Sequence, residues 1–189
     1  MKSFRKIRHK KLFAMVPTIA CIGIIGRSDD PLHISLFPPY MESRLEFSFL
    51  LNSCLDILET RQKQTSVDQD LGLLHAVDER LSVYGWLTNT GIKLLIVVDL
   101  AGKPTTAELE KRRGHAVSTL KDSDLKPAFR ALQNAYIQLL QNPFYSPDAH
   151  IPNIKATTPK HSPCSLSNRK FLTEVNRIGD SWMPGIAIV

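Results

Sequence analysis

Five consecutive apolar residues, Leu94–Val98, constrain the fold more than any other part of this 189-residue chain. A strand with one face in water alternates apolar and polar side chains, whereas a continuously apolar strand is covered on both faces. Leu81–Thr88 precedes this run, and Gly91 between them accepts the positive φ angle that a tight turn needs. The pattern predicts a hairpin whose second strand, Ile92–Asp99, is central and buried on both faces.

Three further strands are predicted outside this hairpin. Val16–Ile25 is an apolar, β-rich run that ends before a turn-forming segment, and the following residues 32–36 alternate apolar and polar side chains. These two segments predict a first hairpin. Leu71–Ala76 is predicted to be the next strand along the chain.

Apolar residues at helical spacing predict three helices. The first begins after Ser43 and runs to about Thr60, and the second begins near Ser123 and is stopped at Asn142 by the following proline. The third covers residues 171–178, with Gly179 as its expected C-terminal cap. The order β-β-α-β-β-β-α-α predicts an α+β fold with antiparallel strands in one sheet and helices packed on it. The apolar stripes of the first two helices are Phe47, Leu51, Cys54, Leu55 and Leu58, then Leu125, Phe129, Leu132, Tyr136 and Leu139/Leu140.

The chain is expected to form a single domain over residues 15–179, with long loops at 102–121 and 146–168 and a tail at 180–189. Residues 1–14 contain six basic residues and no acidic one. We interpret them as a disordered extension or as the product of a start placed upstream of Met15. Without them the chain has eighteen basic and eighteen acidic residues, so the domain is neutral and nucleic-acid binding is not expected.

The sequence gives no signal for a membrane span or for a disulfide framework. No apolar run approaches eighteen residues, and Pro17 interrupts the one run that follows the basic N-terminus and resembles a secretory signal in outline. Three cysteines cannot form a disulfide framework, and no Asn-x-Ser/Thr sequon occurs. Both features are typical of a reducing cytosolic compartment.

No catalytic, cofactor or metal site is predicted. The chain has neither a Gly-x-Gly-x-x-Gly motif nor a P-loop, and His161 with Cys164 supplies only two of the three or four ligands that zinc requires. Cys54 lies on the buried stripe of its helix, which favours packing over reactivity. His33 and His75 lie within strands and are interpreted as structural residues. A small hydrolase that uses Cys54 or a histidine is the least favoured alternative.

Phe49, Asn52, Asp56 and Glu59 are the candidate residues for binding a partner. They lie on the first helix, opposite its apolar stripe. An exposed aromatic residue near an acidic one is typical of a protein-binding surface, because aromatic anchors and charge pairs concentrate binding energy. The alternative is that Asp56 is merely a solvated surface charge.

The segment Asn142-Pro143-Phe144-Tyr145 has a turn-forming pattern that phosphotyrosine-binding-type domains and endocytic adaptors can bind. Because it directly follows a packed helix, we expect its two aromatic side chains to fold back onto the domain.

Several motifs occur together and in a fixed order along residues 17–147: Pro31-Leu-His-Ile34, Leu45-Glu-Phe47, Asn52-Ser-Cys-Leu-Asp56, Leu71-Gly-Leu-Leu74, Val83-Tyr-Gly-Trp-Leu-Thr-Asn89, Val97-Val-Asp99, Phe129-Arg-Ala-Leu-Gln-Asn-Ala-Tyr136 and Asn142-Pro-Phe-Tyr-Ser-Pro147. Together they resemble the sedlin family of trafficking protein particle (TRAPP) complex subunits. The similarity is greatest to the subunit 2-like branch, and the loops indicate a fungal version. The last helix shares the resemblance more faintly.

The resemblance implies a longin-like (SNARE-like) fold with a five-stranded antiparallel sheet between helices. It also implies a non-catalytic adaptor that links the core of a vesicle-tethering complex to its large specific subunits. That complex activates Rab GTPases in ER-Golgi and Golgi traffic. The expected partners are therefore other TRAPP core and large subunits, with a Rab GTPase and the membrane reached only through the complex. The implied location is cytoplasmic and peripheral on Golgi and early secretory membranes. The alternative is a longin-type SNARE regulator or a small adaptin-like coat subunit.

Overall fold

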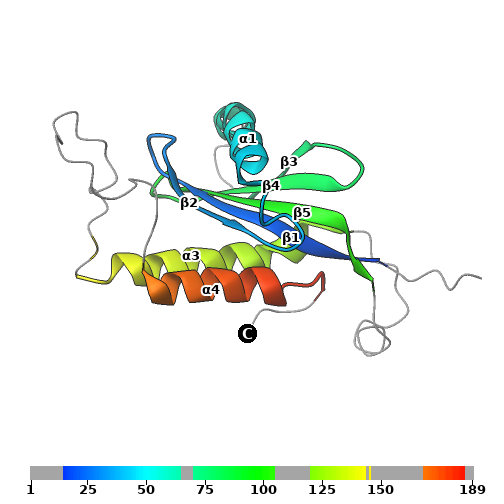
Figure 1. The fold of residues 1–189 in the computed structure, drawn as a ribbon. Helices are drawn as coiled ribbons and strands as arrows, with labels where there is room; N and C mark the ends of the chain where they lie inside the picture. The colour runs from blue at the N-terminus through cyan, green and yellow to red at the C-terminus, as the bar shows by residue number, and fades with distance from the viewer. Residues whose placement is uncertain (1–14, 65–69, 105–119, 144, 146–167, 186–189) are drawn as a thin grey trace, which may run out of the picture.

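The computed structural model describes residues 15–64, 70–104, 120–143, 145 and 168–185. The described residues form an α+β fold in which a single sheet is flanked by helices on both faces (Figure 1). The predicted extension 1–14 and most of the predicted loops 102–121 and 146–168 lie outside the described residues.

The five predicted strands form one antiparallel sheet, as expected. Its spatial order is β2-β1-β5-β4-β3, so the strand that contains the continuous apolar run is at the centre. The strands are β1 Met15–Ile25, β2 Pro31–Leu36, β3 Asp70–Ala76, β4 Leu81–Leu87 and β5 Lys93–Pro104.

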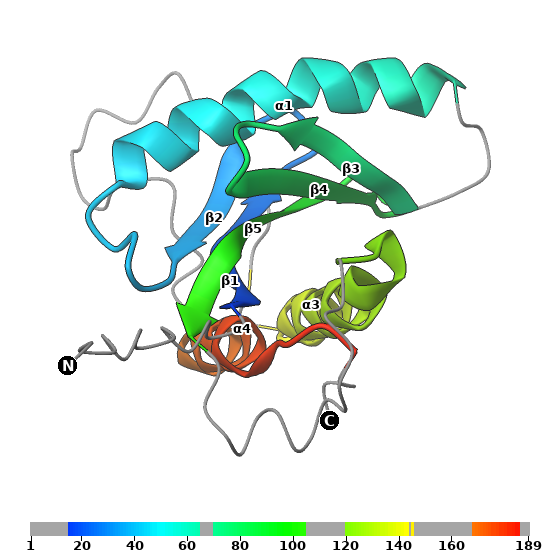
Figure 2. The same cartoon turned by 90° about the vertical axis from the view of Figure 1, so that its right-hand side faces the viewer.

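Strand β5 is buried on both faces, because each face packs into a separate hydrophobic cluster. Leu94, Ile96 and Val98 belong to the cluster under α3 (Lys126–Leu140) and α4 (Arg169–Ser181), whereas Leu95 and Val97 belong to the cluster under α1 (Arg44–Gln64). All five side chains are fully buried. Burial of one such side chain contributes roughly 1.5–3 kcal/mol. Figures 1 and 2 show α1 on one side of the sheet and α3 beside α4 on the other.

The predicted apolar stripes of the helices face the sheet. Every residue of the stripe in α1 is buried, and in α3 Leu139 is buried while Leu140 is 42 % exposed. Helix α1 runs to Gln64, one turn beyond the predicted end near Thr60, because no Gly or Pro stops it there. A short 3-10 helix, η1 (Asp122–Leu125), leads into α3, and Pro127 lies in the first turn of α3, where a proline is tolerated.

The prediction that Gly179 caps the last helix is wrong. Helix α4 continues to Ser181, and Trp182 is its C-terminal cap residue. Gly179 is buried inside the helix, and a Cβ atom at this position would overlap the ring of Phe37. This glycine therefore allows the close approach of α4 to Phe37, a role that the local sequence does not distinguish from capping.

The prediction that the chain becomes a tail at Asp180 is also wrong for residues 180–185. Trp182 is 1 % exposed and belongs to the cluster between the sheet and α3 and α4. Its indole Nε1 donates a hydrogen bond to the Asp124 carbonyl oxygen at 3.1 Å. The burial of Trp182 holds this segment against the domain. The sequence did not indicate this contact, because the segment is too short to show a helical pattern.

Strand β5 extends beyond the predicted end at Asp99 to Pro104, so residues 102–104 belong to the sheet and not to the predicted loop. Met15 and Val16 pair with Pro104 and Lys103, and the register shifts between Val16 and Thr18. Gly102 adopts a φ of +43°, and a Cβ atom there would overlap the carbonyl group of Val16. The glycine thus permits a bulge through which the strand continues.

Candidate partner-binding surface

The four predicted partner-binding residues lie together on the outer side of α1. Phe49 is 67 % exposed, and Asn52, Asp56 and Glu59 are exposed. Their spacing of three, four and three residues places them along one side of a helix. This side points away from the sheet, because the opposite side of α1 packs against it (Figure 2).

Two further apolar residues at or just before the start of α1 are exposed, and the sequence did not single them out. Leu45, one helical turn before Phe49, is 69 % exposed, and Met41, just before α1, is 60 % exposed. Leu45 lies four residues before Phe49, a spacing that places both residues on one side of a helix. We call Leu45, Phe49, Asn52, Asp56 and Glu59 the outer face of α1.

The outer face of α1 has an apolar end and an acidic end. At the acidic end Glu59 forms an exposed ion pair with Lys63, with 3.0 Å between Oε1 and Nζ. Such a pair contributes little to stability. The Asp56 carboxylate has no ion pair or hydrogen bond within the part of the chain that the structure describes. It borders a shallow depression that is also lined by Ile57, Thr60 and Arg61.

Of the cysteine and histidine residues considered as nucleophiles or bases, Cys54 and His33 are buried, whereas His75 is exposed. Cys54 is fully buried, and burial raises the pKa of its thiol; burial likewise raises the pKa of Cys21 to about 12. Burial, helped by the charge of Arg44, lowers the pKa of His33 to about 4. Its Nε2 lies 2.6 Å from the Ser35 hydroxyl, and its ring contacts Phe171 edge-on. His75 is exposed on β3.

The structure describes only part of the Asn142–Tyr145 segment and does not describe the His161 and Cys164 pair. Tyr145 is partly buried and packs against the cluster under α3 and α4, as expected, while Phe144 lies outside the described residues, as do His161 and Cys164. Among the described residues, no group of three His, Cys, Asp or Glu side chains could hold a metal ion. No helix in the described ranges has the length and apolar character needed to cross a membrane.

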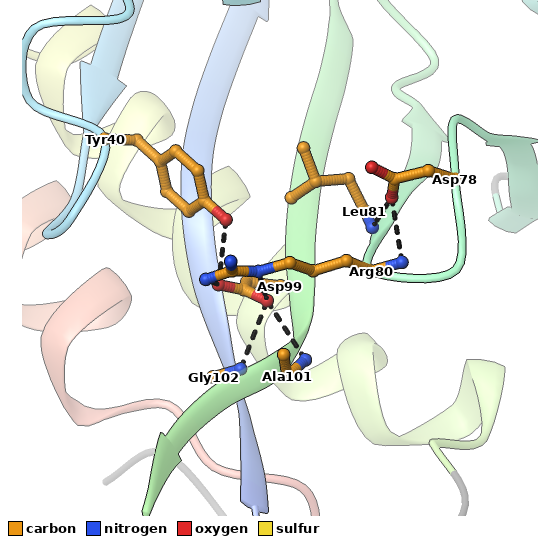
Figure 3. Close-up of polar contacts among 7 residues, drawn as sticks. All are labelled: Tyr40, Asp78, Arg80, Leu81, Asp99, Ala101 and Gly102. Atoms are coloured by element: carbon orange, nitrogen blue, oxygen red, sulfur yellow. Dashed lines mark hydrogen bonds and ion pairs between the residues drawn. The ribbon is translucent and has the colours of Figure 1, made fainter.

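A buried carboxylate, Asp99, lies in β5 beside the turn between β3 and β4, and no local sequence pattern indicated it. Asp99 accepts hydrogen bonds from the Tyr40 hydroxyl at 2.9 Å, from the Ala101 N–H at 3.0 Å and from the Gly102 N–H at 3.1 Å (Figure 3). The guanidinium group of Arg80 donates two further hydrogen bonds to the Asp99 carboxylate. Because Tyr40 belongs to the segment that enters α1, this network fixes where α1 begins relative to β5.

The turn that carries Arg80 is itself fixed by Asp78. One carboxylate oxygen of Asp78 accepts hydrogen bonds from the N–H groups of Arg80 at 2.8 Å and Leu81 at 2.5 Å (Figure 3). This side-chain-to-backbone arrangement is a common way to close a turn before a strand. It places Arg80 beside Asp99 in the second half of β5.

The sequence matches known proteins over most of its length. The Sedlin family model matches residues 24–158. A trafficking protein particle complex subunit 2-like protein from Dictyostelium discoideum is 35 % identical over 165 residues, which cover 85 % of this chain and 95 % of that protein. Proteins of the same name from Mus musculus and Bos taurus are 31 % and 29 % identical over 137 residues, which cover 69 % of this chain and 86 % of each relative. The longin-like α+β fold agrees with these matches, and the chain belongs to the sedlin family.

Proposed function

We propose that this protein is a non-catalytic adaptor subunit of a TRAPP-type vesicle-tethering complex. In this role it links the core of the complex to its large specific subunits, and the assembled complex activates a Rab GTPase in ER-Golgi and Golgi traffic. The protein would reach Golgi and early secretory membranes only as part of that complex. The proposal is supported by the family membership and by the names of the relatives, which are subunits of trafficking protein particle complexes.

The observation that carries the proposal is the composition of the outer face of α1. A folded domain rarely leaves a leucine and a phenylalanine two-thirds exposed on adjacent helical turns unless another surface covers them. Leu45 and Phe49 provide the aromatic and aliphatic anchor that protein interfaces favour, and Asp56 provides an unpaired charge at the rim of the same face. We infer that a partner covers this face and brings a basic group to Asp56.

The experiment is an affinity purification of tagged protein from its native source, with Phe49→Glu and Asp56→Tyr compared with the wild type. Loss of a partner's contact with a desolvated charge costs about 2–5 kcal/mol in binding, which is at least a tenfold loss of affinity. Both variants should therefore lose the large TRAPP subunits while they keep the wild-type melting temperature.

The matched control is Ile137→Glu, which introduces the same charge at an apolar residue that is 42 % exposed on α3. The control should retain every TRAPP subunit. If both α1 variants recover as much of the complex as the wild type does, the outer face of α1 is not part of the interface. Co-purification of a coiled-coil helix without TRAPP subunits would instead indicate the SNARE-regulator alternative.

A further inference from the structure

A pocket of about 420 Å3 opens where two hairpin turns meet the end of α1. Its lining includes Arg27 from the turn after β1, Gln62 from the last turns of α1, Asn89 and Thr90 from the turn after β4, and Lys93 at the start of β5. Small-molecule sites typically measure roughly 300–1,000 Å3. The pocket shares no residue with the outer face of α1, so the inference below does not depend on the proposed function.

The charged groups in the lining are both basic, and they differ in how they are paired. The Lys93 ammonium group forms an ion pair with Asp29, whose side chain is 57 % exposed and lies outside the lining. Arg27 is exposed and has no ion pair or hydrogen bond within the described ranges of the chain. The guanidinium group of Arg27 is therefore available to an anion.

The aliphatic part of the Arg27 side chain lies against the neighbouring turn. Gly91 adopts a φ of +82°, and a Cβ atom at Gly91 would lie 3.2 Å from Cγ of Arg27. The aliphatic part of Arg27 thus runs over the Gly91 turn and brings two basic side chains, from two different hairpins, to one pocket. A guanidinium group binds the oxygens of a phosphate in a bidentate manner, and an ammonium group adds a point charge.

The hydroxyl of Thr90 gives the pocket an acceptor as well as donors. The Thr88 hydroxyl donates to the Ile92 carbonyl at 3.0 Å and accepts from the Ile92 N–H at 2.9 Å. The Thr90 hydroxyl, 3.0 Å from that of Thr88, therefore acts as the donor in their contact and keeps its lone pairs as acceptors. An acceptor of this kind repels phosphate oxygens but binds the hydroxyl groups of a ligand. The Gln62 amide can also bind hydroxyl groups, because it both donates and accepts.

We propose that this pocket binds the phosphate ester of a hydroxyl-rich group, such as an inositol phosphate or a sugar phosphate. The phosphate lies between Arg27 and Lys93, and hydroxyl groups of the ring donate to Thr90 and pair with Gln62. Both a dissolved phosphate ester and the head group of a lipid carry this chemistry, and the experiment below distinguishes the two sources.

The test uses the full-length protein, labelled with nitrogen-15, and inositol monophosphate as the probe. Addition of the probe should shift the amide resonances of Arg27, Thr90 and Gly91. Arg27→Gln keeps the aliphatic part of the side chain and removes the charge, and it should weaken binding about tenfold, because a charge-assisted hydrogen bond is lost. Arg130→Gln, at an exposed position on α3, is the matched control and should bind as the wild type does.

Inorganic phosphate and inositol serve as partial ligands, and each should bind more weakly than inositol monophosphate. Phosphatidylcholine vesicles with and without phosphatidylinositol phosphate distinguish the two sources of the ligand. The basic residues 1–14 are present in every variant, so their attraction to anionic vesicles cancels in the comparison. Arg27-dependent retention on the phosphoinositide vesicles indicates a lipid head group, whereas a response only to the dissolved probe indicates a free phosphate ester; either result supports the site.

Three results would overturn the proposal. The first is equal affinity of Arg27→Gln and the wild type for inositol monophosphate. The second is equal affinity of the wild type for inorganic phosphate, which would show that the pocket does not bind hydroxyl groups. The third is an equal loss of binding in Arg130→Gln, which would show that attraction is due to net charge alone.

Discussion

Arg80 and Asp99 form a bidentate ion pair that joins the turn before β4 to the second half of β5. Arg80 Nε donates to Oδ1 of Asp99 at 2.9 Å, and Nη2 donates to Oδ2 at 2.8 Å. The Asp99 side chain is 1 % exposed, whereas that of Arg80 is 48 % exposed. Burial raises the pKa of Asp99, but the hydrogen bonds from Arg80, the Gly102 N–H and Tyr40 outweigh it and hold the pKa below its ordinary value of 3.8. The carboxylate is therefore charged in the folded protein at neutral pH.

Asp99→Asn should lower the free energy of unfolding by about 3 kcal/mol, because a buried ion pair loses one charge and an amide N–H group then faces donors. Urea unfolding measures the change. The matched control is Asp56→Asn, which makes the same substitution at an exposed position and should change stability by less than about 0.5 kcal/mol. Equal unfolding midpoints for the two variants would mean that the network around Asp99 does not stabilise the fold.

Below neutral pH, His33 should make the protein less stable. Its folded-state pKa of about 4 lies below the ordinary value of 6.5, so the unfolded chain binds the proton first as the pH falls. The contribution of His33 to the free energy of unfolding is therefore fully present above pH 6.5 and decreases between pH 6.5 and about 4. Below pH 4 this contribution no longer changes. The loss from this one group is at most about 3 kcal/mol.

His33→Gln should flatten the dependence of unfolding free energy on pH across this window, whatever it does to the absolute stability. His75→Gln, at an exposed position on β3, should leave the slope unchanged. Denaturant unfolding at a series of pH values gives both slopes. If His33→Gln and the wild type lose stability in parallel, the acid sensitivity has another origin.

Removal of the C-terminal residues from Asp180 onward should lower the free energy of unfolding by at least about 3 kcal/mol. Such a truncation deletes the buried Trp182 side chain and its hydrogen bond to Asp124, and loss of a large aromatic side chain from a core costs about 3–5 kcal/mol. A truncation after Gly185, which keeps Trp182, is the comparison. Thermal unfolding of both proteins measures the difference, and similar melting temperatures would contradict the role given to Trp182.

Gly179→Ala should destabilise the protein even though alanine favours helix formation by about 1 kcal/mol over glycine. The added methyl group would overlap the Phe37 ring, which is 5 % exposed and has little room to move. Overpacking of this kind costs about 1–3 kcal/mol. Asn176→Ala, at an exposed position of the same helix, should be neutral or stabilising. The two free energies of unfolding, measured in urea, should thus differ in sign or clearly in size; a stabilised Gly179→Ala would contradict the tight packing of Gly179 against Phe37.

The candidate binding surface could be predicted in part from the sequence. The buried stripe of α1 determines which residues point outward, so Phe49, Asn52, Asp56 and Glu59 were found from spacing alone. Leu45 was missed, since an apolar residue at the start of a helix does not by itself indicate on which side it lies. The pocket at Arg27 and Lys93 could not be predicted, because its residues come from two turns and a helix end that only the folded sheet brings together.

The amino-acid sequence alone determined the strands, the three helices and the central position of β5, because these depend on the local periodicity of apolar residues. Only the tertiary structure decided the roles of Asp99, Gly179 and Trp182. Asp99 binds Tyr40 and Trp182 binds Asp124, and the two residues of each pair are at least 58 positions apart in the sequence. Gly179 and Phe37, which are in contact, are still farther apart. A local pattern indicates which side of a helix or strand is buried, but not which distant residue packs against it. The roles of Asp99, Gly179 and Trp182 depend on those distant contacts.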